Sequence, residues 1–472
     1  MLKSLYPVYV IAHREIRDQF RDWRIVFPII ILTILFPFLM NYTAQEMLGF
    51  VSKYGGEIVG ERLIPFLLMI VGFFPSSFSL IIALETFVGE KERGSIEPLL
   101  STPLEDWQLY LGKLSSAVVP PLFGSFLGMT VYLTGLAIGR APLPDGEMMA
   151  LIILLTIVQA VMMVSGAVVV SCQATSVRAA NLLSSFIIIP VTLLIQGESM
   201  LMFWGNYGTL WMAFFGVILL TFLLMRMGLA YFRREELLGR EIDVLNLRWG
   251  WMTFWQAFTG GAKNVWQWYR RVIPKTLAAL RLPFVIVFLM GAAGVAIGFS
   301  LVRQFPIIAP PEMFTNLEER LGLLTEAFKP GTFGPVLMVF GNNLRVMALA
   351  LLLGIFSFAV LGVLPIIVTL AVVGYILGIL GLNGLPAGAF FAGLILPHAW
   401  LEIPAALLAT AAVLRSGALL ATPAQGKKIG QVWLESVAVW AQMMIGIVIP
   451  ALFIAAMIEV WITPHLASLI LR

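Results

Sequence analysis

The amino-acid sequence predicts an all-α polytopic integral membrane protein with about eleven transmembrane helices. Hydrophobic residues make up 60% of its 472 residues and charged residues only 12%, whereas a soluble domain carries roughly 25% charged residues. Apolar runs of about 20 residues, long enough to cross a hydrocarbon core as helices, recur along the whole chain. Because the short alternating segments of outer-membrane barrels are lacking, helices are the predicted spanning elements.

The predicted elements follow in order from the N-terminus. Residues 8–24 place apolar side chains such as Phe20 at helical spacing, and the arginines fall on other faces of the same helix. This pattern is typical of an elbow helix in the membrane interface. In the second half of the chain, only Gly362 and Pro365 interrupt the apolar region 344–382. The predicted spans are approximately 25–42, 63–88, 109–138, 148–172, 179–196, 208–228, 283–302, 343–360, 365–382, 388–414 and 432–462.

The placement of lysine and arginine predicts the orientation of these spans. With the N-terminus in the cytoplasm, the basic residues concentrate on the inner side. We therefore expect a multi-pass protein of the cell's inner (plasma) membrane, in contact with lipid. Because the basic residues flank spans rather than cover a soluble module, no nucleic-acid partner is expected. The basic residues left on the outer side are Lys53, Arg62, Arg140, Arg303, Arg320, Lys329, Arg345 and Arg472.

A basic, tryptophan-rich segment divides the chain into two membrane domains. Tryptophan together with arginine is typical of the lipid headgroup layer. We expect residues 236–281 to form cytoplasmic interfacial linker helices between a domain at 1–235 and a domain at 282–472. The segment acts either as an anchored linker or as a specific lipid-regulatory site. Its tryptophans are Trp249, Trp251, Trp255, Trp266 and Trp268.

The run from Glu85 to Lys113 is the most informative loop of the chain. It lies on the cytoplasmic side, between the second and third predicted spans. Its pattern predicts a short charged helix, a break at Gly94, a second helical turn from Ser95 and a stop at Pro103 before the next span. A short helix of this kind, lying parallel to the membrane, could transmit a push from a soluble partner to two spans at once.

This run resembles the first cytoplasmic loop of the ABC type-2 permeases, a family of sodium, drug, lipid and polysaccharide exporters. The family pattern is E-x-x-x-x-E-K-E-R-G-[ST]-x-E-x-L-L-x-[ST]-P, with G-K a few residues later. The resemblance covers about residues 1–235, including the elbow helix and six spans. The matching residues are Glu85, Glu90, Lys91, Glu92, Arg93, Gly94, Ser95, Glu97, Leu99, Leu100, Thr102, Pro103, Gly112 and Lys113.

The resemblance implies that the chain is the membrane-spanning permease subunit of an ATP-driven ABC exporter. In this family the loop, here residues 89–108, docks into a cleft of a separate ATP-binding subunit, whose ATP-driven closure re-orients the permease. The residues expected to couple this chain to the ATPase are Glu85, Glu90, Lys91, Glu92, Arg93, Gly94, Ser95, Glu97, Pro103 and Lys113.

The chain itself is not expected to be an enzyme. It contains no G-x-x-x-x-G-K-[ST] motif, which is the pattern that cradles nucleotide phosphates. We therefore expect no cofactor in this chain, and ATP and Mg²⁺ in the partner subunit. Because six spans with one docking loop make half a transporter, a homodimer is expected.

The C-terminal half resembles a second family, the stage II sporulation protein M family of small bacterial membrane proteins. The family pattern usually has glycine after the histidine, where this chain has Ala399. The resemblance implies a role in envelope remodelling or scaffolding, with envelope proteins as partners. The matching residues are Asn342, Asn343, Gly354, Asn383, Gly384, Gly388, Pro397, His398, Glu402 and Ala405.

An intramembrane polar cluster is predicted in this second domain. His398 and Glu402 are four residues apart, so they share one face of a helix inside a span, and their cost in lipid predicts that they face the bundle interior. Asn342 and Asn343 are candidate third partners, and Glu459 is a weaker candidate for a pore-lining or interfacial carboxylate. The cluster is a buried structural group, a proton or substrate relay, or a metal-dependent catalytic site.

No metal ligand is assigned from the sequence, because the chain contains no H-E-x-x-H motif. Two alternatives to the exporter stay open. The first is a membrane scaffold for envelope or cell-wall remodelling, in which ATP binding by the partner is a signal rather than a drive for transport. The second is an intramembrane enzyme centred on His398 and Glu402, which would require a bound metal.

Overall fold

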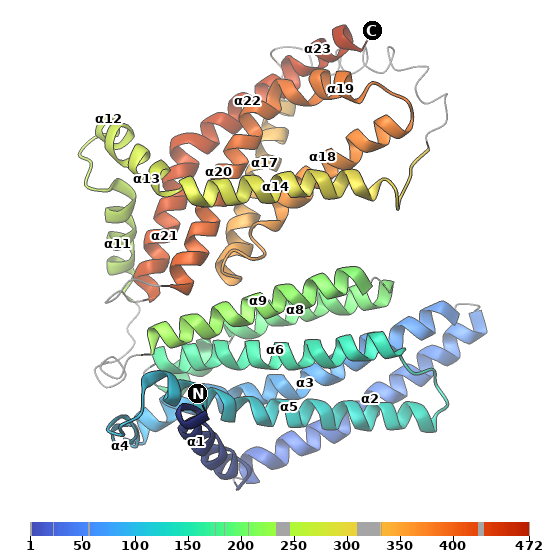
Figure 1. Cartoon of the computed structure of the whole chain (residues 1–472), viewed down its shortest axis with the longest axis vertical. Coiled ribbons are helices and arrows are strands. Elements are labelled where there is room, and N and C mark those ends of the chain that lie inside the picture. Colours follow the sequence, from blue (N-terminus) through green and yellow to red (C-terminus); the bar gives the residue numbers. More distant parts are fainter. Residues whose placement is uncertain are drawn as a thin grey trace. The chain divides into compact units, whose positions relative to one another are not determined.

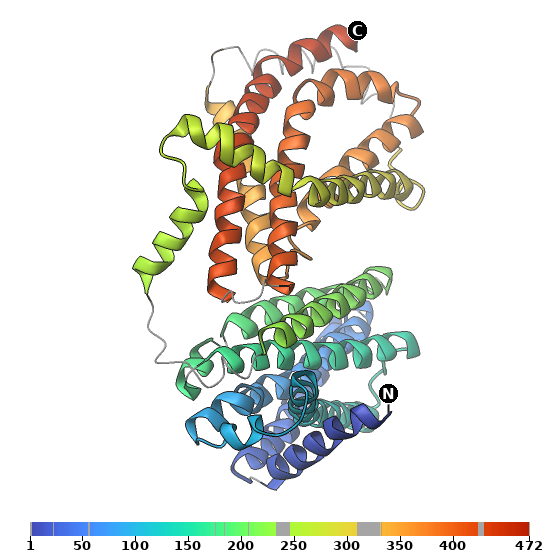
Figure 2. The same cartoon turned by 60° about the vertical axis from the view of Figure 1, so that its left-hand side comes forward.

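The protein is described by a computed structural model in which every regular element is a helix (Figures 1 and 2). The chain divides into two compact units, Met1–Leu245 and Asn246–Arg472. Within the residues described, this confirms the all-α class. The residues outside the description are 1, 22, 55–56, 175, 184, 206, 233–245, 309–330, 332, 423–428 and 472.

The first unit is a bundle arranged around one long helix, α3. This helix packs against α2, α5, α6 and α8, and α6 in turn packs along α9. The side chains between these helices form one continuous apolar core that includes Leu68, Leu84 and Leu151. Its helices are α1 (Leu2–Arg21), α2 (Trp23–Tyr54), α3 (Glu57–Glu92), α4 (Ile96–Leu100), α5 (Asp106–Ile138), α6 (Gly146–Gln173), α7 (Val177–Leu183), α8 (Ser185–Trp204) and α9 (Tyr207–Tyr231).

The predicted elbow corresponds to α1, which packs along α5. Its contact depends on a glycine: a Cβ atom added at Gly112 of α5 would lie 2.9 Å from the Ile11 side chain of α1. The close approach of the two helices therefore leaves no room for a larger residue at this position.

The second unit has its own apolar core, in which Leu407, Met444 and Leu452 are buried. Helix α20 packs against α14, α17, α21 and α22. The helices of this unit are α11 (Leu247–Thr259), α12 (Val265–Gln267), η1 (Trp268–Val272), α13 (Ile273–Ala279), α14 (Arg281–Leu301), α17 (Phe333–Phe356), α18 (Leu364–Leu382), α19 (Ala387–Phe390), η2 (Phe391–Ile395), α20 (Leu396–Ala421), α21 (Ile429–Met443), η3 (Met444–Val448), α22 (Ile449–Trp461) and α23 (Thr463–Ile470).

Helices α14 and α18 form the most extensive helix pair of this unit, and glycines set their separation. A Cβ atom added at Gly298 of α14 would lie 1.8 Å from the backbone oxygen of Ala371, and one at Gly374 of α18 would lie 2.1 Å from that of Val295. Small residues that let two backbones touch are the usual device for packing helices in lipid, where the hydrophobic effect does not drive association.

From Asn246 onward, the segment expected as a linker is folded as part of the second unit. Helix α11 packs on α21, and Gln442 of α21 donates hydrogen bonds of 2.9 Å to the backbone oxygens of Ala257 and Phe258. Trp268 is buried in the core of this unit and donates to Phe258 at 2.8 Å. Trp268 therefore contributes to the packing of the core, in addition to any contact that the tryptophans make with lipid headgroups.

Eight helical stretches of the described chain are long and apolar enough to cross a membrane. The chain is therefore a polytopic membrane protein, but the expected count of about eleven spans is not confirmed. These stretches are Asp106–Ile138, Gly146–Cys172, Tyr207–Ala230, Arg281–Leu301, Phe333–Ile355, Leu364–Leu382, Ala387–Ala421 and Gly430–Trp461, to which the shorter apolar stretch Arg62–Pro75 is added.

Candidate functional site

The loop between α3 and α5 folds as a helix, a glycine turn and a second short helix. Helix α3 ends at Glu92 and α4 begins at Ile96. Between them Gly94 has a φ of +68°, a left-handed conformation that glycine adopts without steric cost. The Ser95 backbone N–H donates to the Glu90 carbonyl at 3.0 Å, which closes the turn. The glycine therefore has a local structural reason to be at this position.

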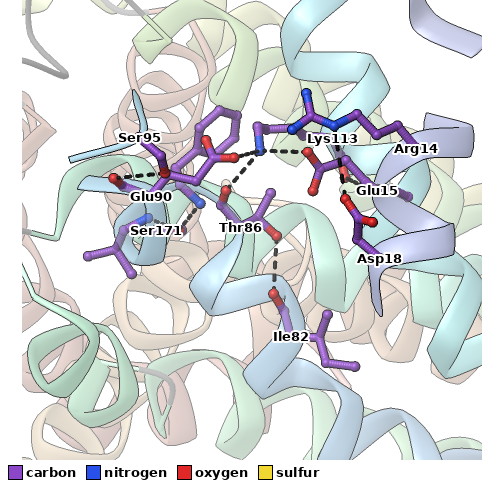
Figure 3. A network of polar contacts seen from close by, with 12 residues as sticks. Arg14, Glu15, Asp18, Ile82, Thr86, Glu90, Ser95, Lys113 and Ser171 are labelled. Carbon is purple, nitrogen blue, oxygen red and sulfur yellow. Dashed lines mark hydrogen bonds and ion pairs between the residues drawn. The ribbon is translucent and has the colours of Figure 1, made fainter. Parts of the chain in front are cut away.

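Lys113 of α5 holds the base of this loop (Figure 3). Its side chain has no exposed surface, and its Nζ lies 2.8 Å from Glu90 Oε1 and 3.5 Å from Glu15 Oε1. The same Nζ donates to the Thr86 carbonyl at 3.2 Å. These contacts use the three hydrogen-bond donors of an ammonium group. One buried cation thus joins α1, α3 and α5.

The surroundings of Lys113 are both polar and aromatic. Its Nζ lies 5.3 Å from the centre of the Phe87 ring, a distance at which a cation is attracted by the ring face. Burial raises the pKa of the Glu90 carboxyl above its ordinary value, while the Lys113 ammonium acts in the opposite direction. A charge buried so completely is tolerated only with such partners.

The end of α3 is also tied to the joint between α6 and α7. Lys91 Nζ donates to the backbone oxygens of Cys172, at 2.8 Å, and Ala174, at 3.2 Å. The lysine thus supplies hydrogen bonds to carbonyls at the C-terminal end of α6, where a positive charge is favourable. The Glu92 carboxylate accepts a hydrogen bond of 2.8 Å from the backbone N–H of Val177, the first residue of α7. A displacement of the loop would therefore also displace the joint between α6 and α7.

The expected coupling residues separate into two groups. Glu90, Lys91, Glu92 and Lys113 anchor the loop through the contacts described above. Glu85 is half-buried on α3 and is not among the ion-pair partners of Lys113. The residues whose side chains or backbone face solvent at the outer end of the loop, here called the outer group, are Arg93, Gly94, Ser95, Glu97 and Pro103.

The polar cluster of the second unit is built by three helices. His398 and Glu402 lie on α20, and Glu459 lies on α22; one ligand-type atom of each lies within 4.8 Å of the other two. Asn343 of α17 lies close to the Glu402 carboxyl, although its buried Nδ2 completes no hydrogen bond of ordinary geometry. Asn342 is exposed.

Two residues of these two sites, Glu15 and Thr463, were not expected from the sequence, and a third, Glu459, was expected only as a separate carboxylate. Glu15 lies on the amphipathic elbow helix, where a charged residue carries no special signal. Thr463 lies 3.3 Å from His398 through its Oγ1, and nothing in the spacing of the two residues indicates this contact. Glu459 had been considered only as a lone carboxylate, because its approach to Glu402 depends on how α20 and α22 pack.

The comparisons with known proteins match two separate parts of the chain. Residues 9–207 match the family model of the ABC-2 family transporter protein, and residues 284–464 match that of stage II sporulation protein M. The loop anchored by Lys113 lies in the first match and the polar cluster in the second. No curated protein and no solved structure matches the chain.

Proposed function

We propose that this chain, in which an ABC-2-type permease domain precedes a stage II sporulation protein M domain, is the membrane subunit of an ATP-driven exporter. A separate ATP-binding subunit, which binds ATP and Mg²⁺, drives it through the cytoplasmic loop 89–108. The family match to residues 9–207 and the apolar helices support a permease of an ABC transporter. The partner, the direction of transport and the cytoplasmic N-terminus are part of the proposal.

The observation that carries this proposal is the division of the loop into an anchored base and an exposed outer group. A force applied to α4 reaches α3 through the turn at Gly94 and reaches α1 and α5 through Lys113. Because the Lys113 ammonium is fully buried and contacts both α1 and α3, we expect the base of the loop to move as one unit with them.

The stoichiometry follows from the number of loops. One chain offers one such loop, and closure of two ATP-binding subunits needs two. We therefore propose a homodimer of this chain in the inner membrane, with two ATP-binding subunits on the cytoplasmic side. Two-fold symmetry is the commonest arrangement of identical subunits and places both loops on one face.

Affinity purification from native membranes tests the proposal. We expect an ATP-binding subunit to co-purify with the wild-type chain and its recovery to fall about tenfold with Arg93→Glu/Glu97→Lys, a loss of about 1.4 kcal/mol in binding. Both residues are exposed, so the variant should keep the elution volume of the folded protein. Lys263→Glu, an exposed charge reversal in the second unit, is the matched control and should retain the partner.

A second function is favoured by the match of residues 284–464 to stage II sporulation protein M. In this alternative the chain is a membrane scaffold for envelope remodelling, and ATP binding by the partner serves as a signal. The two functions differ in one measurable respect. An exporter reconstituted in vesicles with its partner should hydrolyse ATP continuously. A scaffold should instead co-purify with envelope proteins and show no sustained ATP hydrolysis. Recovery of no ATP-binding subunit by the wild type would contradict both.

A further inference from the structure

The cluster at His398, Glu402 and Glu459 has the composition of a metal site. It brings together one imidazole and two carboxylates from α20 and α22, all half-buried. Among the described residues no other group of at least three histidine, cysteine, aspartate or glutamate side chains converges in this way. One imidazole with two carboxylates suits first-row divalent metals such as Zn²⁺ and Mn²⁺.

A threonine fixes the ring nitrogen that His398 presents to the cluster. The Thr463 hydroxyl donates its proton to the Ile458 carbonyl at 3.2 Å, so its oxygen is left to accept a hydrogen bond. It lies 3.3 Å from His398 Nδ1, and we therefore assign the ring proton to Nδ1. Nε2 then carries the lone pair. A histidine that binds a metal through one nitrogen generally donates from the other in this manner.

The charges of the cluster require a positive partner. Glu402 and Glu459 are neighbours within one half-buried site, and in the described part of the chain neither forms an ion pair with lysine or arginine. Two carboxylates at this separation repel each other strongly in a medium of low polarity. A shared proton or a bound cation must compensate them, and the oriented imidazole lone pair favours the cation.

The geometry points to a divalent transition-metal site, with Zn²⁺ as its best match, held by His398 Nε2 and one oxygen each of Glu402 and Glu459. Zinc bonds of roughly 2.0–2.1 Å place tetrahedral ligands about 3.3 Å apart. The three ligand atoms already lie within 4.8 Å of one another, so small side-chain rotations complete the site. A fourth position remains for water or for the Asn343 side chain. This inference is independent of the exporter proposal.

Metal content of the full chain tests the site. Protein purified in detergent, stripped with a chelator and dialysed against Zn²⁺ should hold one zinc per chain by mass spectrometry of the metal. His398→Ala and Glu459→Gln should each reduce this to background. The matched controls are His465→Ala and Glu435→Gln, because His465 is exposed on α23 and Glu435 lies on α21; both should retain one zinc. Co²⁺ in place of Zn²⁺ should give visible absorption bands of a low-coordinate site in the wild type and in both controls, but not in His398→Ala or Glu459→Gln.

The orienting role of Thr463 gives a second, graded readout. Thr463→Val removes the acceptor without removing a ligand, so the apparent Kd for Zn²⁺ should rise about 10- to 100-fold while saturating metal still gives one ion per chain. The proposal is overturned if the wild type binds no zinc and shows no Co²⁺ absorption, since the cluster would then hold a proton. It is also overturned if His398→Ala and Glu459→Gln, eluting as folded protein, bind zinc as the wild type does.

Discussion

Lys113 shows how one residue can decide the stability of a loop. Its ammonium has no exposed surface, whereas the side chains of its two carboxylate partners, Glu90 and Glu15, keep 24% and 22% of theirs exposed. The two sides of the ion pair therefore respond differently to mutation. Water can reach the exposed part of each carboxylate side chain, whereas it cannot reach the lysine, so the lysine depends more strongly on its partners.

We predict from this asymmetry that Glu90→Gln destabilises the protein more than Lys113→Met does. Glu90→Gln should cost about 1–3 kcal/mol, because it weakens the closest contact of a buried charge, and adding Lys113→Met to it should recover most of the loss. Thermal unfolding in detergent, followed by tryptophan fluorescence, measures both. Asp18→Asn is the control, since its 3.9 Å pair with Arg14 is exposed and should change little. Equal effects of Glu90→Gln and Asp18→Asn would contradict the role given to Lys113.

At the scale of helices, the pair α14 and α18 depends on close backbone contact. Gly374→Ala adds a single methyl group 2.1 Å from the Val295 carbonyl. A backbone carbonyl cannot rotate out of the way as a flexible side chain can, so the two helices must move apart. We expect this to lower the free energy of unfolding by about 1–3 kcal/mol. Gly381→Ala, on the same helix α18 with open space around it, should be neutral or slightly stabilising because alanine favours helices.

Thermal stability and the yield of monodisperse protein measure this difference. Both substitutions replace glycine by alanine on α18, and helix propensity favours alanine, so a large loss confined to Gly374→Ala reports packing. A loss with Gly381→Ala as large as that with Gly374→Ala would show that the α14–α18 contact does not set the stability of the unit.

The helices could be predicted from the sequence because hydrophobic length is a property of single segments. The apolar run 344–382 breaks close to the predicted position: α17 ends at Phe356, four residues before the predicted end at 360, and α18 begins at Leu364. The turn between them includes Phe358 and Ala359 at positive φ. Contacts between segments could not be predicted in this way. Which face of a helix contacts another helix depends on side-chain packing. A helix in lipid can be apolar on every face, so the pattern of polar and apolar residues does not predict the contacting face.

The candidate sites show the same division. The loop motif indicated the residues of one site but not which of them face inward; that Lys113 is buried against Glu15 of α1 follows only from the fold. The i, i+4 spacing placed His398 beside Glu402, whereas Glu459 and Thr463 come from later in the chain. Local spacing predicts half of a site when one helix supplies two residues, and tertiary structure supplies the rest.

For the whole molecule, the division into two units argues that each can keep its own structure. The first has a core around α3 that includes Leu84, and the second has a core around α20 that includes Leu407. A polypeptide with two separate cores loses no buried side chain from either core when the chain is cut between them. The helices α11–α13 belong to the second unit, so the cut must precede Asn246.

We therefore predict that a protease site inserted between Phe232 and Asn246 can be cleaved without unfolding either unit. After cleavage in the membrane, the thermal transition reported by tryptophans of the second unit should shift by less than about 2 °C, because less than roughly 0.5 kcal/mol is lost. The first unit should still recover the ATP-binding subunit in detergent. Cleavage that aggregates either unit would show that the two cores depend on each other. ATP hydrolysis by the cleaved protein then separates the functions: an exporter whose second domain only accompanies it keeps its activity, and one gated by that domain loses it.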